Sequence, residues 1–501
     1  MPDIDGRHLA LDDIVAIARE RQPVRLASSA RSRVRRSQQF AERVAAQRPI
    51  YGRSTGVGAN RDLVLLDPQA ASLSLLRSHA TSSGALRSDE RVRAMLLIRL
   101  NQLSADGNGI DPALLDALGA MLAADALPPV REGGSIGTAD LAALATTALA
   151  LCGEIPTTPA IENTASFGAG DALTFMSSNA AVLADAALAV ADLDRLSRAV
   201  PIIAAMGFAA VRGNPEAFDP AVEVATPFPG AQWVCQTMRA LIGPSTAAPA
   251  RIQDPFGLRT LPQVHGALMD QLTHSEGVVL SMVNAGSENP MVSATHGVAH
   301  HGAFHAAYLV QALDGLVLAL AQSAQLSLAR VTMLAEPAYT GLHPFLGDGT
   351  PAASGMMIVE YSAASALAEL RALANPAGLQ VVTLSRGVEE DASFATLAAS
   401  QALGAVSRFR AVLAAELVTS LRCLRMQRVR PTGLEAAVAF LDAADGGISD
   451  VHDRDLTSDL LLAEGLVGGL PETLPLVLGP RGPRPDEQRL APSEEPRWHS
   501  T

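Results

Sequence analysis

Five long stretches of this chain repeat apolar residues every three or four positions, which is the spacing of one face of an α-helix. They cover residues 179–199, 264–284, 303–330, 355–374 and 396–428. In the last stretch, one face would carry Val406, Phe409, Leu413, Leu417, Leu421 and Leu424. Alternating strand patterns are scarce, and long apolar helices need partners to bury them. The sequence therefore predicts an all-α, or mainly α, fold built on a long central helical bundle.

Shorter patterns organise the rest of the chain. Helical patterns cover residues 8–19, 62–77 and 91–103, and Gly and Pro mark irregular segments at 50–61, 105–111 and 128–138. We expect a loop-rich N-terminal region over 1–195, a central bundle over 196–430 and a C-terminal segment over 431–501. From about residue 475 the chain is rich in Pro, Arg and Glu, so we expect a tail that is mobile or wrapped over a partner.

Composition excludes several kinds of chemistry. All 38 basic side chains counted as Lys and Arg are Arg, so the chain cannot form a lysine Schiff base. That excludes ordinary pyridoxal phosphate attachment and class I aldolase chemistry, and it also removes the P-loop lysine. The net charge is −13, and the short cluster at Arg31, Arg33, Arg35 and Arg36 sits in a helical pattern. We interpret the cluster as a solvated helix face and expect no nucleic-acid partner.

Cysteine and hydropathy patterns point to a soluble protein of a reducing compartment. The three cysteines, Cys152, Cys235 and Cys423, are far apart in apolar surroundings, so we expect buried hydrophobic side chains without a disulfide framework. The acidic N-terminus lacks a signal-peptide pattern. The most apolar segments, 140–152 and 308–328, are short or interrupted by Asp and Gln. We expect a cytoplasmic protein with no membrane partner.

Histidines cluster at His296, His300, His301 and His305. Their helical spacing would place His301 and His305 on one face. Two histidines make an incomplete zinc site, so we predict no metal.

Four separated segments carry the functional motifs. The first is Tyr-Gly-Arg-Ser-Thr-Gly-Val-Gly at 51–58, and the second runs from 128 to 144 and contains Gly-Ser-Ile-Gly-Thr-Ala-Asp-Leu at 134–141. The third is Gln-Asp-Pro-Phe-Gly-Leu-Arg-Thr-Leu-Pro-Gln-Val at 253–264. The fourth runs from Glu-Asn-Pro at 288–290 through Gly-Ala-Phe-His at 302–305 to Ser-Gly-Met-Met at 354–357 and Glu-Glu-Asp at 389–391. In this order, over roughly residues 5–430, the set resembles the aromatic amino acid lyase superfamily of histidine and phenylalanine ammonia-lyases.

The resemblance implies an architecture and an assembly. The fold would be the central helical bundle of the aromatic amino acid lyase and fumarase-like type. The protein would be a homotetramer that acts on a small-molecule substrate, with residues from three subunits in each active site.

The second segment departs from the family pattern. Family members cyclise an internal Ala-Ser-Gly there into a methylidene-imidazolone (MIO) ring. Here the flanks survive, but the Ser-Gly pair is gone and the segment is one residue short, leaving a degenerate cofactor segment of Gly137, Thr138, Ala139 and Asp140. The asparagine that helps the cofactor react in the family is replaced around residues 176–178. Glu389 stands where the family has the Gln of its Gln-Glu-Asp triplet, and Phe256 stands where it has the second tyrosine of the third motif. We therefore expect the scaffold without a cofactor.

Two residues keep the chemistry that elimination requires. Tyr51 stands in a Gly-rich loop that a ligand can approach closely, and a tyrosine with a lowered pKa can act as a general base. The resemblance implies that Tyr51 removes the β-proton, whereas a plain interpretation is a packed loop aromatic. Arg259 offers a rigid fork of donors for a substrate carboxylate, the role that the resemblance implies. The alternative for Arg259 is a structural ion pair, for example with Asp254.

The resemblance assigns further residues to the site. Glu390 matches a carboxylate near the substrate amine, although three adjacent acids usually form a solvated face. His79 matches a substrate-contacting histidine of the histidine-specific branch, but a lone histidine is often structural. Asn289 and Phe304 match positions that line the pocket or support the cofactor loop, and Asn289 could instead only brace backbone groups. Phe256 could contribute to an aromatic cage for a substrate cation.

Three functions remain open for such a chain. It could eliminate a good leaving group, such as trimethylamine from a betaine, using only Tyr51 and Arg259; this resembles ergothionase, a superfamily member without the cofactor. It could instead use the tyrosine for dehydration, conjugate addition or cyclisation in a biosynthetic pathway. It could also be a non-catalytic oligomeric scaffold.

Overall fold

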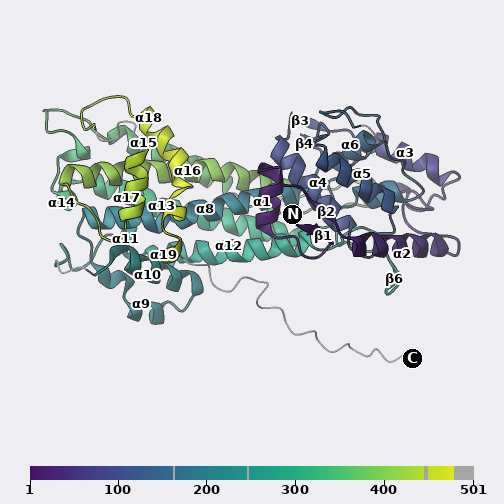
Figure 1. The fold of residues 1–501 in the computed structure, drawn as a ribbon, viewed down its shortest axis with the longest axis horizontal. Coiled ribbons are helices and arrows are strands. Elements are labelled where there is room, and N and C mark those ends of the chain that lie inside the picture. The colour runs from purple at the N-terminus through teal and green to yellow at the C-terminus, as the bar shows by residue number, and fades with distance from the viewer. Residues whose placement is uncertain (162–163, 245–247, 445–449, 479–501) are drawn as a thin grey trace. The chain divides into compact units, whose positions relative to one another are not determined.

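The structure is a computed structural model that describes residues 1–161, 164–244, 248–444 and 450–478 (Figure 1). The chain divides into two compact units, each assembled from three stretches of sequence. Unit 1 comprises Met1–Leu193, Val278–Leu318 and Leu370–Ser407, and unit 2 comprises Asp194–Gly277, Ala319–Glu369 and Arg408–Thr501. The division of the sequence into regions 1–195, 196–430 and 431–501 stays a prediction. The Pro-rich run at 479–485 lies outside the described residues.

Unit 1 is built mostly from short and medium helices. They are α1 (Leu11–Arg19), α2 (Ser28–Ala45), α3 (Pro68–His79), α4 (Asp89–Leu103), α5 (Pro112–Ala123), α6 (Leu141–Leu151) and α7 (Asp171–Met176). α4 packs against α1 and α5, while α6 packs against α3 and α7 (Figure 1). α4 forms the centre of this core, because every residue from Val92 to Leu103 is buried. Asp67 and Asp111 cap the first turns of α3 and α5, each directly before a proline at the first helical position.

Strand structure in the described residues of unit 1 is limited to three pairs of very short strands. β1 (Asp3–Ile4) pairs in parallel with β2 (Arg25–Leu26). β3 (Ser83–Leu86) pairs antiparallel with β4 (Arg131–Gly133), and β5 (Met291–Ser293) pairs antiparallel with β6 (Gly297–Ala299). These ribbons pin loops to the helical core rather than forming a core sheet.

Unit 2 contains further helices. They are α9 (Pro220–Ala225), α10 (Pro229–Ile242), α11 (Phe256–Arg259), α14 (Pro337–Thr340), α17 (Glu435–Ala443), α18 (Thr457–Val467) and α19 (Pro475–Leu478). Short 3-10 turns punctuate both units: η1 (Gly58–Asn60), η2 (Pro215–Phe218), η3 (Pro344–Leu346), η4 (Ala377–Leu379), η5 (Ser385–Gly387) and η6 (Leu470–Thr473).

Five helices belong in part to each unit, and they are the five that the apolar spacing predicts. They are α8 (Ala180–Ala210), α12 (Leu261–Val283), α13 (Ala307–Ala335), α15 (Met357–Leu373) and α16 (Ala395–Gln427). The predicted face of α16 is buried at all six positions, from Val406 to Leu424. The predicted mainly α-helical fold is therefore confirmed. α8 extends well beyond the predicted end at residue 199, because Pro201 is accommodated inside the helix.

Cys235 and Cys423 are buried as expected, whereas Cys152, which directly follows α6, is only partly buried, so the expectation is wrong for Cys152. Cys152, Cys235 and Cys423 are all free thiols, and burial raises the pKa of the Cys423 thiol to about 12. Two helical stretches, Asp171–Ala210 and Ala307–Ala335, are long and apolar enough to cross a membrane by length and composition. Their apolar windows are 100% and 56% buried, and core helices of folded proteins meet the same criterion.

Candidate active site

Tyr51 lies in the loop between α2 and α3, and two hydrogen bonds fix it. Its backbone N–H donates to His300 Nε2 at 3.2 Å, and its phenol oxygen accepts from the Gly58 N–H at 2.7 Å. Gly58 adopts a φ of 55°, the left-handed region that favours glycine, so the Gly-rich loop can fold back onto the tyrosine ring. The glycines thus hold the hydroxyl in one place.

The electrostatic surroundings of Tyr51 favour the protonated phenol. Burial raises the pKa of Tyr51, the Gly58 hydrogen bond opposes this, and the Glu389 carboxylate raises the pKa further. Arg61 lowers the pKa by a weaker charge interaction. This direction is opposite to the lowered pKa expected of a general base, because the fold buries the ring and brings the Glu389 carboxylate close to it.

Asp140 is the anchor of the degenerate cofactor segment. Its buried carboxylate accepts hydrogen bonds from Ser135 Oγ at 2.9 Å and from the Val182 N–H at 2.9 Å. Its own N–H donates to the Ser178 carbonyl at 2.7 Å. Burial raises the pKa of Asp140, and the two donated hydrogen bonds act against that rise. Because Asp140 is the N-cap residue of α6 and receives an N–H from the first turn of α8, it ties the starts of both helices together.

The backbone of the segment is held in left-handed conformations. Gly137 has a φ of 84°, and a Cβ added there would lie 2.2 Å from Ser393 Oγ. That hydroxyl donates to the Gly137 carbonyl at 2.7 Å. Ala139 has a φ of 77°, which is rare for a residue with a side chain. Thr138 forms an isolated bridge with His305. The segment is therefore a tightly fitted turn even without the Ser-Gly pair.

Asn179 is a site residue that the sequence argument missed. Its side chain is 1% exposed, accepts from the Ala139 N–H at 3.2 Å and donates to the Phe304 carbonyl at 2.6 Å. Asn179 lies just beyond residues 176–178, where the family's helper asparagine is expected to be replaced. A search for an asparagine at the start of α8 would have found it. Asn179 links the cofactor segment to the loop that carries Phe304.

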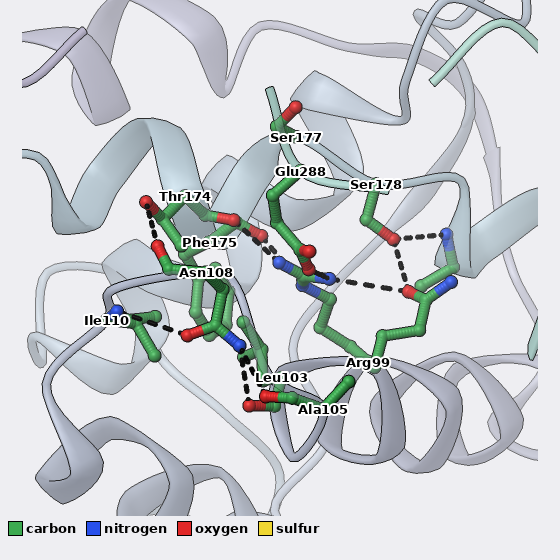
Figure 2. A network of polar contacts seen from close by, with 12 residues as sticks. Arg99, Leu103, Ala105, Asn108, Ile110, Thr174, Phe175, Ser177, Ser178 and Glu288 are labelled. Atoms are coloured by element: carbon green, nitrogen blue, oxygen red, sulfur yellow. Dashed lines mark hydrogen bonds and ion pairs between the residues drawn. The ribbon is translucent and has the colours of Figure 1, made fainter. Parts of the chain in front are cut away.

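A buried ion pair joins Arg99 of α4 to Glu288 of the Glu-Asn-Pro motif (Figure 2). Arg99 donates to Glu288 at 2.7 Å, and these side chains are only 1% and 3% exposed. Arg99 also donates to the carbonyls of Thr174, at 2.6 Å, and Phe175, at 3.0 Å. Burial lowers the pKa of Arg99, against the charge of Glu288. The pair holds the end of α7 against the Glu-Asn-Pro motif.

Asn289 braces backbone groups beside this pair. Its N–H donates to Ser177 Oγ at 3.0 Å, and its side-chain oxygen accepts from the His301 N–H at 2.9 Å. These contacts fit the bracing interpretation that the sequence left open. Phe304 is half-buried, and its carbonyl is the group that Asn179 binds. A role of Asn289 or Phe304 in lining a substrate pocket stays a prediction.

The acidic triplet presents its members differently. Glu390 is exposed, whereas Asp391 lies 3.3 Å from His305 Nε2. Glu389 is partly buried, and its carboxylate raises the pKa of Tyr51. The turn before it, η5, runs through three left-handed residues, with φ values of 50°, 59° and 83° at Ser385, Arg386 and Gly387. The role predicted for Glu390 stays a prediction.

His79 ends α3 and has local contacts. Its Nδ1 lies 3.0 Å from the Leu75 carbonyl and 3.0 Å from Ser78 Oγ. These contacts match the structural interpretation, and a contact with substrate stays a prediction.

Arg259 and Phe256 belong to unit 2, in the single turn of α11. The guanidinium of Arg259 stacks on the Phe256 ring at 4.6 Å, and the ring itself is 64% exposed. Asp254 pairs instead with Arg251, at 2.8 Å. The alternative of an Arg259–Asp254 ion pair is therefore wrong. The stacked guanidinium covers a face of Phe256 on which a cation cage would depend.

The histidine cluster does not lie on a helix. His296 sits between β5 and β6, while His300, His301 and His305 follow β6 in a loop that ends before α13. The expectation that His301 and His305 share a helical face is wrong, because residues 300–306 form a loop and α13 begins only at Ala307. Within the described residues, no group of three His, Cys, Asp or Glu side chains is arranged to hold a metal ion.

Comparison with known proteins places this geometry in a family. The profile of the aromatic amino acid lyase family matches residues 9–444. The chain is 34% identical to histidine ammonia-lyase from Gloeobacter violaceus, with 88% of this chain and 92% of that protein covered. It is also 34% identical to histidine ammonia-lyase from Symbiobacterium thermophilum, with 95% and 98% covered.

Solved structures share the fold at lower sequence identity. Ergothionase from Treponema denticola, an ergothioneine-degrading enzyme, superposes with a TM-score of 0.87 at 23% identity, covering 95% of this chain and all of that one. Histidine ammonia-lyase from Trypanosoma cruzi superposes with a TM-score of 0.86 at 23% identity, covering 95% of both chains. The motifs, the fold and these relatives agree, and the chain belongs to the aromatic amino acid lyase family.

Proposed function

We propose that this protein is a carbon–nitrogen lyase that works without an MIO ring. The observation that carries the proposal is the segment 137–140, which has no serine to cyclise. The nearby Ser135 lies outside residues 137–140, and its hydroxyl donates a hydrogen bond to the Asp140 carboxylate. The residues present therefore do not fit the formation of that ring.

The absence of an electrophile limits the leaving group. A primary amine leaves carbon poorly, whereas a trimethylammonium group leaves as neutral trimethylamine and takes the C–N electron pair with it. We infer a substrate that carries such a group and a carboxylate. An aromatic or imidazole side chain is supported by the similarity to histidine ammonia-lyases. The product would be a conjugated acrylate.

Tyr51 is the proposed base. Its phenolate oxygen would take the β-proton, the C–H electrons would form the double bond, and the C–N bond would break. Because burial raises the pKa of Tyr51, the free enzyme would hold the phenol protonated near neutral pH. A permanent positive charge on the bound substrate would favour the phenolate by Coulomb attraction. This direction supports a cationic substrate.

Arg259 is the proposed carboxylate clamp. Stacking on Phe256 holds its planar guanidinium, and the carboxylate of Asp254 is already engaged by Arg251. We further propose the homotetramer that the family resemblance implies, in which Arg259 of one subunit would serve the Tyr51 loop of another.

Two other functions remain as outcomes of the tests. The same base could drive a dehydration, a conjugate addition or a cyclisation, and the chain could be a scaffold without activity. The fixed geometry of the Tyr51 hydroxyl favours an enzyme over a scaffold.

The first experiment is the intact mass of the purified protein. Formation of the MIO ring removes two water molecules, so the proposal predicts the mass of the unmodified sequence. A deficit of two water molecules would overturn the cofactor-free premise.

The second experiment offers the enzyme ergothioneine, hercynine and L-histidine in parallel. We expect near-ultraviolet absorbance of an acrylate and release of trimethylamine from a betaine, with no ammonia from L-histidine. Tyr51→Phe should abolish turnover, while Tyr339→Phe, whose ring stacks under Arg251, should retain it. Turnover that survives Tyr51→Phe would remove Tyr51 as the base, and inactivity on all betaines would favour the other two functions.

A further inference from the structure

A pocket of about 330 Å³ opens inside unit 2, at the C-terminal ends of α8 and α10. Residues 430–432, which follow α16, complete its wall. Its volume falls within the range of small-molecule sites. None of the candidate active-site residues lines it, so it is a separate feature of the chain.

The pocket has an apolar base. Ala205 and Phe208 of α8 and Leu241 of α10 line it, and all three are buried in the core of unit 2. No acidic side chain of the described residues contributes to the lining. The interior therefore suits an apolar body and does not repel an anion.

Two arginines provide the charge at the pocket. Arg212 and Arg430 both line it, and both are exposed. Within the described part of the chain, neither guanidinium takes part in a hydrogen bond or an ion pair. This contrasts with nearby Arg251, which is bound to Asp254 at 2.8 Å. Two unpaired guanidinium groups beside an apolar cavity match a carboxylate ligand.

Capping of α8 does not explain Arg212. Basic side chains often bind the free carbonyls at the end of a helix. Here those carbonyls are already occupied, because the Ala210 carbonyl accepts from Gln427 at 3.0 Å and the Val211 carbonyl accepts from Arg251 at 2.8 Å. The Arg212 carbonyl accepts from the Ala250 N–H at 3.0 Å. The Arg212 side chain is thus available to a ligand.

The backbone at Arg212 would suit glycine better. Its φ is 48°, and the next N–H, of Gly213, closes the helix on the Phe208 carbonyl at 3.0 Å. Helices commonly end this way with glycine in the left-handed position. Arg428 is a second arginine in this conformation, with a φ of 58° at the end of α16, but it does not line the pocket.

We propose that this pocket is a binding site for a small carboxylate with an apolar or aromatic body. The carboxylate lies between Arg212 and Arg430, and the body enters the cavity over Phe208 and Leu241. The site is independent of the proposed elimination reaction and of the Arg259 clamp.

The test uses trans-cinnamate as the probe and isothermal titration calorimetry of the full chain. All proteins carry Arg259→Ala, so that binding at the proposed active site does not contribute. We expect Arg212→Gly and Arg430→Ala each to weaken binding by about tenfold or more, since each removes a charge-assisted contact. Arg212→Gly also relieves the left-handed backbone, so the variant should fold at least as well as its parent.

Arg428→Gly is the matched control, because it makes the same change in charge and backbone at an arginine outside the pocket. It should leave the affinity within about twofold of the parent, as for a contact-free surface position. The neutral amide of the probe should bind at least about tenfold more weakly than the acid. Equal losses in Arg212→Gly and Arg428→Gly, no loss in Arg212→Gly, no binding by the parent, or equal binding of the amide would each overturn the proposal.

Discussion

Asn179→Ala should loosen the degenerate cofactor segment. The substitution removes both hydrogen bonds that join Ala139 to the Phe304 loop, and the side chain is only 1% exposed. Water cannot easily replace the lost partners at that depth. Each buried polar group left without a partner costs about 1–3 kcal/mol, so for the Ala139 N–H and the Phe304 carbonyl together we expect a loss of about 2–6 kcal/mol in the free energy of unfolding.

The assay combines urea unfolding, followed by circular dichroism, with hydrogen exchange of the peptide that contains residues 134–141. Exchange should accelerate in that peptide, because the Ala139 N–H loses its acceptor. Asn375→Ala is the control, since Asn375 is exposed and donates only to the nearby Ala372 carbonyl. It should change the free energy of unfolding by less than about 0.5 kcal/mol.

Asn179→Asp separates the two hydrogen bonds. The aspartate keeps an acceptor for the Ala139 N–H but places an oxygen against the Phe304 carbonyl, where Asn179 now donates at 2.6 Å. It should therefore destabilise the protein while protecting Ala139 better than the alanine variant does. A loss below about 1 kcal/mol in Asn179→Ala, with unchanged exchange at 134–141, would refute the bracing role.

Three further perturbations test the buried groups. Burial lowers the pKa of His265 to about 3, so the stability that its neutral form contributes is complete above pH 6.5 and falls as the pH drops towards 3. The unmodified protein should therefore lose about 2 kcal/mol in the free energy of unfolding between pH 7 and pH 5. His265→Asn should not show this loss when its unfolding is measured at the same two pH values. Gly137→Ala should lower the stability measured by thermal unfolding by about 2–4 kcal/mol, because the added methyl group would overlap Ser393 Oγ. Gly297→Ala is the control: Gly297 has a similar φ of 80° but open space around it, so the loss should be only about 1 kcal/mol. Similar losses in the two variants would contradict the steric explanation. Glu288→Gln should lower the free energy of unfolding, measured in urea, by about 3–5 kcal/mol, because Arg99 stays buried beside a neutral partner. If replacing both residues, by Leu and Met, lowered it by the same amount, the unpaired charge would not be the reason.

Periodicity predicts the long helices well because their apolar faces are continuous. α12 and α16 begin and end within three residues of the predicted limits. α8 is longer than its sequence pattern predicts. A proline such as Pro201 usually ends a helix, but here the helix continues to Ala210 with an apolar, buried surface that outweighs the lost hydrogen bond.

The candidate site is only half visible in the sequence. Motifs identify Tyr51 and Asn289, which stand in distinctive local patterns. They do not identify the groups that hold these residues in place: Arg99 reaches Glu288 across 189 positions, and Asn179 reaches the Phe304 carbonyl across 125. No spacing rule covers contacts of that separation, because they depend on how helices pack. The raised pKa of Tyr51 likewise follows from neighbours such as Glu389, which only the fold brings close.

If the protein works without an MIO ring, as we propose, the position of Asp140 limits how an Ala-Ser-Gly triplet could be introduced into the segment. Point substitutions that wrote Ala-Ser-Gly over residues 138–140 would remove the carboxylate that joins the starts of α6 and α8. The introduced serine would then lie in a loop that no longer has the Asp140 carboxylate as its anchor. A triplet that leaves Asp140 in place therefore requires an inserted residue together with substitutions.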